Sequence, residues 1–115
     1  MKDCIFCKIV RKEIPCAPLH ESERVLAFAD TQPQAPVHVI IIPKKHYSHL
    51  GEIPAAELSL LQEMVETARV LAKKQGIDEK GYRLALNVNR EGGQSVYHVH
   101  LHLLGGKQLG PSLVG

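Results

Sequence analysis

Residues 98–103 read His-Val-His-Leu-His-Leu, so imidazole and aliphatic side chains alternate with a period of two. Successive side chains on a β-strand point to opposite faces of the sheet. The segment therefore predicts a strand with His98, His100 and His102 on one face and an aliphatic row on the other. We expect the aliphatic row to enter the core, because burying Val and Leu side chains stabilises a fold. The chain is thus constrained to contain a sheet with one packed face and one histidine face.

Five extended segments and two helical segments are predicted along the chain. The strands are rich in β-branched residues or bounded by turns, and the short turn at residues 91–94 makes the last two antiparallel. There is no internal repeat or linker, which predicts one domain over residues 1–115 with a tail from about residue 107. The element order favours an α+β fold with a mainly antiparallel sheet. The expected helices are 4–12 and 54–75, and the expected strands are 19–21, 25–29, 37–42, 82–88 and 96–104.

The predicted long helix carries more apolar surface than one sheet face needs. One apolar stripe recurs at spacings of three and four residues, and a second set widens it. A small domain gains stability by association, so the wide apolar surface indicates a partner surface on this helix. The stripe consists of Leu58, Leu61, Val65, Ala68 and Ala72, and the widening set of Leu60, Met64 and Leu71.

Composition and charge exclude several classes of protein. The formal net charge is +2 and the basic residues are scattered, which disfavours a nucleic-acid surface. No apolar run approaches the roughly 20 residues that span a bilayer, and the N-terminus lacks a signal-peptide pattern. Three cysteines, an odd number, do not form a disulfide framework. We therefore expect a cytoplasmic protein without a membrane or nucleic-acid partner.

Three histidines on one face indicate a ligand. Buried imidazoles are unfavourable unless they are paired, and clustered rings compete for protons. Two ligands fit such a row: a metal ion, as in three-histidine zinc sites, or a phosphate held and attacked by the rings. The turn at residues 92–95, Gly-Gly-Gln-Ser, offers backbone N–H groups to an anion. A phosphate-binding turn leading into a histidine row favours phosphoryl chemistry.

Several motifs together identify a family resemblance. In His98–Leu104 each histidine is followed by an apolar residue, and further matching segments cover about residues 4–108. These segments are Lys12–Pro15, Ile42–His46, Gly92–Tyr97 and Gly105–Gln108. With them the chain resembles the histidine triad (HIT) superfamily, and within it the histidine triad nucleotide-binding (Hint) branch.

The resemblance implies a fold and a reaction. The fold is HIT-like, with a five-stranded sheet that joins the sheet of a second copy into ten strands. The reaction is hydrolysis of purine nucleoside 5′-phosphoramidates, such as adenosine 5′-monophosphoramidate or aminoacyl and lysyl derivatives of AMP. His100 would attack the α-phosphorus, displace the amine and form a nucleotidyl-histidine that water then hydrolyses. No cofactor is implied for catalysis, and the expected partners are an AMP- or GMP-type nucleotide and a second copy.

The resemblance also implies roles for the surrounding residues. His102 would donate to a phosphate oxygen, His38 would orient the nucleophile, and Ser95 would lie near the leaving group. His98 completes the expected catalytic set. The expected nucleotide-binding residues are Asp30, Thr31, Asn87, Gly93, Gln94, Ser95, His100, His102, Ile5, Phe6 and Phe28.

The residues alone leave structural alternatives open for part of this set. Asp30 is also a common turn-forming residue ahead of a proline loop. Asn87 and His38 are each compatible with a strand end. Three apolar members, Ile5, Phe6 and Phe28, are by their pattern simply core residues.

Cys4 and Cys7 lie three residues apart on the first helix and so share one face. Two thiols at this spacing supply half of a tetrahedral zinc site. The resemblance adds His46 and His98 as the other two ligands of a structural zinc, which would take His98 away from the phosphate. His49 is a weaker alternative ligand. The other interpretation is two packed thiols without metal, and Cys16 has no evident role.

Two other functions compete with phosphoramidate hydrolysis. One is hydrolysis of dinucleoside polyphosphates, as in the fragile histidine triad branch, although the short chain and residues 105–108 count against it. The other is a zinc- or nucleotide-binding interaction module without turnover. A uridylyltransferase is disfavoured, because that branch resembles His-x-His-x-Gln and this chain has His102. The tail at residues 107–115 lacks the Trp-Pro-Pro-Gly ending of animal members, which leaves the leaving-group preference open.

Overall fold

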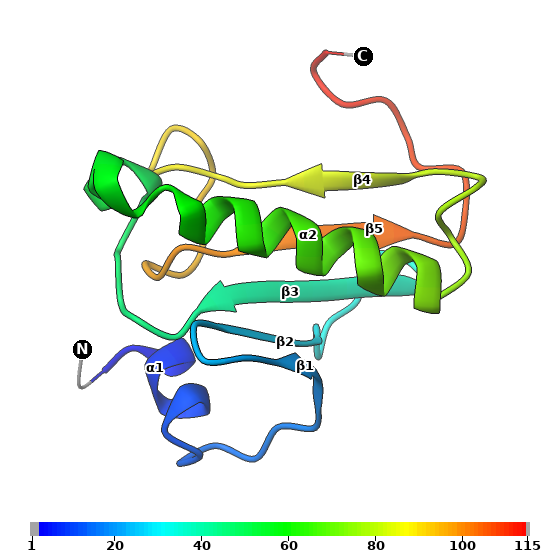
Figure 1. Cartoon of the computed structure of the whole chain (residues 1–115). Coiled ribbons are helices and arrows are strands. Elements are labelled where there is room, and N and C mark those ends of the chain that lie inside the picture. Colours follow the sequence, from blue (N-terminus) through cyan, green and yellow to red (C-terminus); the bar gives the residue numbers. More distant parts are fainter. Residues whose placement is uncertain (1–2, 115) are drawn as a thin grey trace.

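A computed structural model describes residues 3–114 of the chain (Figure 1). No helix in this range is long and apolar enough to cross a bilayer. Five strands and two α-helices form the domain, and two 3-10 turns, Leu50–Glu52 and Ala55–Glu57, precede the longer helix. The helices are α1 (Ile5–Val10) and α2 (Ser59–Lys74). The strands are β1 (Pro18–Glu21), β2 (Val25–Ala29), β3 (Val37–Pro43), β4 (Tyr82–Ala85) and β5 (Leu101–Gly105).

The five strands form one sheet in the order β1-β2-β3-β5-β4. Every neighbouring pair is antiparallel, which confirms the predicted α+β fold class with its long and its short helix. β3 lies at the centre, and its register pairs Ile40 with His102 and His38 with Leu104. The first and second halves of the chain therefore meet along β3 and β5.

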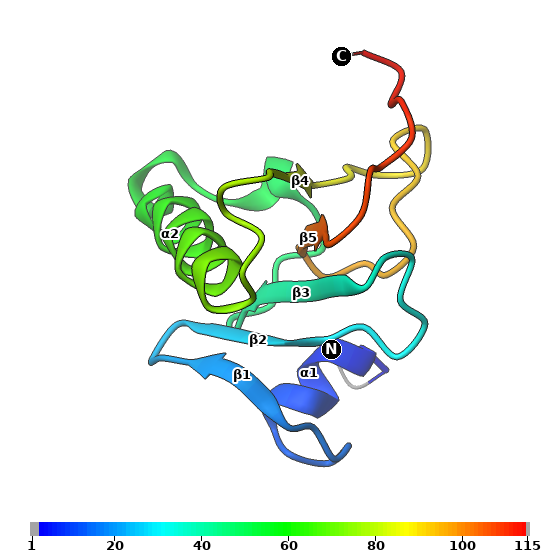
Figure 2. The same ribbon diagram turned by 90° about the vertical axis from the view of Figure 1, so that its right-hand side faces the viewer.

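The two helices cover opposite faces of the sheet (Figure 2). Alternate residues of β2 and β3 contribute to two separate apolar clusters. The cluster under α2 includes Val99, Leu101 and Leu103, which confirms that this aliphatic row enters the core. The smaller cluster under α1 contains Phe6, Leu26, Phe28, Ile40 and Ile42. The histidine side of the motif therefore shares a sheet face with α1.

The prediction of a strand over residues 96–104 was too long at its start. β5 begins at Leu101, so His98 and His100 precede it in irregular chain. Pro43 on β3 contributes to the late start of β5, because it has no N–H to donate to a ladder. Its carbonyl instead accepts a hydrogen bond from the His98 ring at 2.8 Å. β4 is likewise shorter than predicted and ends at Ala85.

The helices are also shorter than predicted. α1 starts at Ile5, and Cys4 caps it by accepting the N–H of Cys7 on its sulfur at 3.3 Å. α2 starts at Ser59 and not at Pro54, because a separate 3-10 turn takes up residues 55–57.

The assignment of the apolar stripe on α2 was partly wrong. Leu58 and Val65 belong to the predicted stripe but are 47% and 43% exposed. The buried face is instead centred on the widening set, with Leu60, Met64, Thr67, Ala68, Leu71 and Ala72 against the sheet. The apolar surface is indeed wider than the sheet covers, and its uncovered edge is the one that carries Leu58 and Val65.

Candidate active site and metal site

The three histidines of the motif lie in one row on the α1 face of the sheet. The rings of His100 and His102 have centroids 4.9 Å apart. Phe6 of α1 meets the rings of His98 and His100 edge-on, at 5.8 and 5.2 Å. His98 and His100 are buried, and His102 is half-buried. The three rings thus lie on one face as predicted, although only His102 belongs to a regular strand.

Hydrogen bonding fixes the form of the His100 ring. Its Nδ1 lies 2.8 Å from the carbonyl oxygen of His98, so Nδ1 carries the proton and donates it. The lone pair of the neutral ring is then on Nε2. Burial lowers the pKa of His100, which favours this neutral form. A neutral imidazole with a free Nε2 is the form that attacks phosphorus.

A chain of hydrogen bonds fixes the form of His102 in the same way. The N–H of Gln34 donates to Nδ1 of His38 at 3.0 Å, so the proton of His38 is on Nε2. That nitrogen lies 2.9 Å from Nδ1 of His102 and 3.4 Å from a carboxylate oxygen of Asp30. His102 therefore accepts on Nδ1 and presents Nε2–H as a donor. Burial and the neighbouring His100 and His38 lower the pKa of His102 to about 4.

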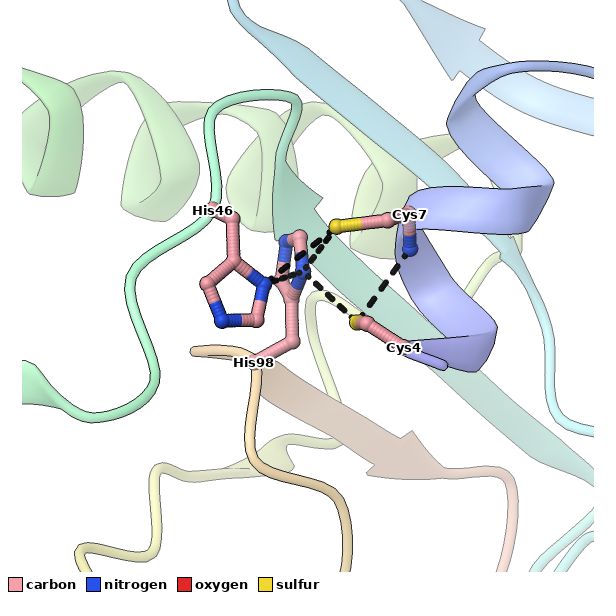
Figure 3. Close-up of side chains that lie close together, drawn as sticks. All are labelled: Cys4, Cys7, His46 and His98. Carbon is pink, nitrogen blue, oxygen red and sulfur yellow. Dashed lines mark hydrogen bonds between the residues drawn. The ribbon is translucent and has the colours of Figure 1, made fainter. Parts of the chain in front are cut away.

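Cys4, Cys7, His46 and His98 come together from three parts of the chain (Figure 3). We call these four residues the Cys/His tetrad. Nδ1 of His98 lies 3.3 Å from the sulfur of Cys4 and 3.6 Å from that of Cys7, and Nδ1 of His46 lies 3.3 Å from the sulfur of Cys7. The two Nδ1 atoms are 3.2 Å apart.

These distances fit a tetrahedral metal. A zinc ion with the usual bond lengths would hold sulfur and nitrogen ligands about 3.5 Å apart and two nitrogens about 3.3 Å apart. Nε2–H of His98 donates to the Pro43 carbonyl, so the Nδ1 lone pair faces the sulfurs. The tetrad thus has both the spacing and the ring form that zinc requires.

Burial disfavours the charged forms of the tetrad's side chains, the cysteine thiolate and the protonated histidine. Desolvation and the neighbouring Cys4 raise the pKa of Cys7 to about 11. Burial, with a smaller contribution from His46, lowers the pKa of His98 to about 4. A divalent cation reverses the first effect, because it binds the thiolate form of cysteine.

The remaining predicted residues are placed less uniformly. Asp30 is half-buried, and its second carboxylate oxygen accepts the N–H of Gln32 at 2.8 Å, so Asp30 also forms a turn. Thr31 is exposed, and Asn87 is half-buried just beyond β4. Phe6 and Phe28 are buried and pack edge-to-face at 5.7 Å. Ile5 differs from both, because it is 47% exposed on the outer side of α1.

The turn before the histidine row has a demanding backbone. Gly93 has a φ of 78°, a conformation that favours glycine. A Cβ on Gly92 would lie 2.4 Å from the carbonyl oxygen of Val88. The side chain of Gln94 is buried and braces the turn by accepting from the N–H of Asn89 and donating to the carbonyl of Ser48. Ser95 is exposed beside it.

Sequence reasoning missed three backbone contributors to the site. The carbonyl of Pro43 sets the form of His98, the N–H of Gln34 that of His38, and the carbonyl of His98 that of His100. No side-chain pattern signals any of them. A cavity of about 370 Å³ beside the tetrad is lined by residues that include Ile5, His46 and Ser95. The larger cavity of about 950 Å³ lies between the end of α2 and the start of β4, and no residue of the triad lines it.

Residues 3–113 match the family model described as "Scavenger mRNA decapping enzyme C-term binding". The chain is 46% identical over 112 residues to a purine nucleoside phosphoramidase of Escherichia coli K12, across 97% of this chain and 94% of the relative. It is 45% identical over 109 residues to a 14 kDa zinc-binding protein of Brassica juncea, across 93% and 96%. The structure of a HIT family hydrolase from Clostridium thermocellum has a TM-score of 0.94 and 44% identity, with 99% of each chain covered.

Proposed function

The chain belongs to the HIT family of hydrolases, and on that premise we propose that it cleaves the P–N bond of purine nucleoside 5′-phosphoramidates. The observation that carries the proposal is the hydrogen bond from Nδ1 of His100 to the His98 carbonyl. It leaves Nε2 of His100 as a buried lone pair beside a second histidine. The similarity to the E. coli purine nucleoside phosphoramidase supports the choice of substrate.

In the proposed first step, Nε2 of His100 forms a bond to the α-phosphorus and the P–N bond breaks. The ring gains positive charge, which the Nδ1–H bond to the His98 carbonyl stabilises. Nε2–H of His102 donates to a phosphate oxygen. The departing amine takes a proton through the hydroxyl of Ser95, which is exposed and recovers a proton from solvent.

In the second step, water attacks the phosphorus of the nucleotidyl-histidine and gives up one proton through Ser95 to solvent, which balances the proton taken up in the first step. The bond between the phosphorus and Nε2 of His100 breaks, the nucleotide leaves, and the neutral ring is restored. Each histidine keeps its form through the cycle because its other nitrogen is already hydrogen bonded. No cofactor is needed for either step.

We further propose that Asp30 binds the ribose hydroxyls and that Phe6 and Phe28 contact the base. Asp30 keeps one oxygen 3.4 Å from Nε2 of His38, so the ribose contact and the histidine chain are connected. Asn87, Thr31 and the turn at Gly93–Ser95 would surround the phosphate and sugar. Ile5 is exposed and would contribute only at the rim of the site.

A turnover panel tests this proposal. Adenosine and guanosine 5′-phosphoramidates are compared with dinucleoside polyphosphates and cap-type dinucleotides, which cover the alternative suggested by the family model. We expect turnover of the phosphoramidates, trapping of a nucleotidyl-enzyme, and loss of both in His100→Ala. The matched control is His20→Ala on β1, outside the histidine row. Faster turnover of dinucleotides would instead assign the protein as a dinucleotide hydrolase. Unchanged phosphoramidate turnover in His100→Ala would exclude His100 as the nucleophile.

We also propose that the tetrad binds one structural zinc. Its four ligand atoms lie within 4.8 Å of one another, and the Brassica juncea relative is named for zinc binding. Thiolate ligands need reduced cysteines, which agrees with a cytoplasmic location. Metal analysis of protein purified without a chelator tests this, with one zinc per chain expected.

We propose a homodimer whose sheets join along β4. β4 is an edge strand with unpaired backbone groups, and Leu84 on it is 37% exposed. Leu58 and Val65 on the uncovered edge of α2 add apolar surface. Sedimentation should give the mass of two chains, and Val65→Asp should shift it towards one. Leu19→Asp on β1, the opposite edge, is the control; a monomer with Leu19→Asp alone would contradict the choice of edge.

A further inference from the structure

The segment that carries the proposed nucleophile is not held by the sheet. His98 and His100 precede β5, whose pairing with β3 starts at Leu101 and with β4 at His102. Within the described chain, the N–H of Val99 donates to the carbonyl of Tyr47 at 2.8 Å, which ties this segment to the loop after β3. The orientation of His100 must therefore come largely from contacts outside the ladder.

His98 supplies the contact made directly to the His100 ring. Its carbonyl accepts from Nδ1 of His100 at 2.8 Å, while its own ring faces the sulfurs of Cys4 and Cys7. The ring is completely buried and is held on its other side by the Pro43 carbonyl. His98 thus connects the two sites: its side chain belongs to the tetrad, and its backbone carbonyl accepts a hydrogen bond from the proposed nucleophile, His100.

Phe6 provides a second connection. It lies on α1, between Cys4 and Cys7 in the sequence, and meets the rings of both His98 and His100 edge-on. α1 has only six residues and is too short to be stable without tertiary contacts. Both cysteines lie at the start of this helix (Figure 3). Their ligation would fix α1, and with it the Phe6 ring against which His100 packs.

We propose that Cys4, Cys7 and His46 are positioning residues for the nucleophile. By holding the side chain of His98 they keep its carbonyl against Nδ1 of His100, and this keeps the attacking lone pair on Nε2. The inference rests on the proposed role of His100. It assigns the tetrad a part in the reaction beyond anchoring α1.

The inference predicts a specific kinetic change. A nucleophile displaced by about 1 Å loses on the order of 100-fold in rate, whereas nucleotide contacts made by Asp30 and the turn stay in place. Removing the metal, or a ligand, should therefore lower kcat roughly 10- to 100-fold and leave KM within about 3-fold. A tetrad that only stabilises the fold would leave kcat per folded molecule unchanged.

The test uses the full-length protein in zinc-loaded, chelator-treated and cobalt-reloaded forms, together with Cys4→Ser. Cobalt absorption reports occupancy of a tetrahedral thiolate site without reference to activity. Nitrogen-15 NMR of the histidines reports the ring form. We expect His100 to show protonated Nδ1 alone in the loaded protein and a mixture of both ring forms after metal removal, with kcat restored by cobalt. Cys16→Ser is the matched control, since Cys16 lies outside the tetrad.

Two results would overturn the inference. One is a folded, metal-free protein with unchanged kcat and a single ring form of His100. The other is a protein that carries no metal as purified, gives no cobalt spectrum, and yet has full kcat. If Cys4→Ser does not fold, chelation of the unaltered chain gives the same comparison. Absence of phosphoramidate turnover in the loaded protein would contradict the proposed function, and the NMR comparison would still decide the coupling.

Discussion

Two clusters flank His100, and they use the same side chain for different purposes. In the Cys/His tetrad, two histidine Nδ1 atoms lie 3.2 Å apart and each is also within 3.3 Å of a sulfur. In the second cluster, which consists of Asp30, His38 and His102, the ring nitrogens are only 2.9 Å apart. The 2.9 Å separation is that of an ordinary hydrogen bond from His38 to His102. The tetrad's distances match the ligand spacing of a tetrahedral zinc site.

The difference teaches that the partners of a histidine, and not its place in the motif, decide its chemistry. In the proposed zinc site, the soft sulfur partners of His98 would share a cation with its Nδ1 lone pair. A backbone N–H and a carboxylate instead orient His38 so that it donates to His102. His100 lies between the two clusters, and its own Nδ1 is occupied by a backbone carbonyl. The four predictions below separate the two clusters experimentally.

The largest expected effect comes from removing the ring between the clusters. His100→Ala should lower kcat by about 1,000-fold or more, because no other group supplies the attacking lone pair. Its zinc content should stay at that of the unaltered protein, since His100 has no atom in the tetrad. Steady-state kinetics and metal analysis on one preparation check both points. Loss of zinc together with activity would mean that the clusters cannot be separated.

The second effect concerns the tetrad. Cys7→Ser should abolish zinc binding and lower Tm by roughly 10 °C, because it removes a buried ligand and releases α1. Calorimetry with metal analysis measures both quantities. Cys16→Ser, a half-buried thiol outside the tetrad, should keep its zinc. Full zinc content in Cys7→Ser would contradict the assignment of the ligands.

The third effect concerns the opposite cluster. His38→Leu, which has no N–H to donate, should lower kcat roughly 10- to 100-fold, since His102 would lose the donor that keeps its own proton on Nε2. Zinc content and Tm should change little compared with Cys7→Ser. Single-turnover measurements of nucleotidyl-enzyme formation test this. An effect on KM alone would place His38 in binding and not in orienting His102.

The smallest effect is a pH dependence of stability. Burial lowers the pKa of His102 to about 4, whereas the unfolded chain has a histidine pKa of about 6.5. The unfolded state therefore binds the proton first. The stability from the neutral ring is fully present above pH 6.5 and is lost as the pH falls towards 4.

Urea denaturation of metal-free protein at pH 7.5, 5.5 and 4.5 measures this slope. His102→Asn should make the decline between pH 6.5 and 4 less steep than in the unaltered chain. Asp30, His38 and His100 face the same ring and remain in both proteins, so the difference isolates His102. Equal slopes would mean that His102 does not titrate in this range.

The sequence predicted the elements of the fold well, for local reasons. Period-two alternation identified the buried row at Val99, Leu101 and Leu103, because it depends only on an extended backbone. The spacing of Cys4 and Cys7 predicted that the two thiols lie together, although Cys4 caps α1 and does not lie on the helix as expected. The period-two alternation of residues 98–103 made the predicted last strand too long. Alternating side chains do not require a paired backbone, and His98 and His100 lie outside the ladder.

Only the tertiary structure decided which partners these residues have. His46 and His98 are far apart in the chain, and they meet because β3 and β5 pair in one register and α1 packs over the end of β3. The sequence also left open which side of α2 meets the sheet. The stripe with Leu58 and Val65 and the set with Leu60 and Met64 both satisfy helical periodicity. Ring forms depend on the carbonyls of Pro43 and His98 and the N–H of Gln34, backbone groups that every sequence has. The sequence determined which groups are available for the proposed phosphate and metal chemistry, and the fold decided which ring nitrogens of His38, His98 and His100 are already hydrogen bonded.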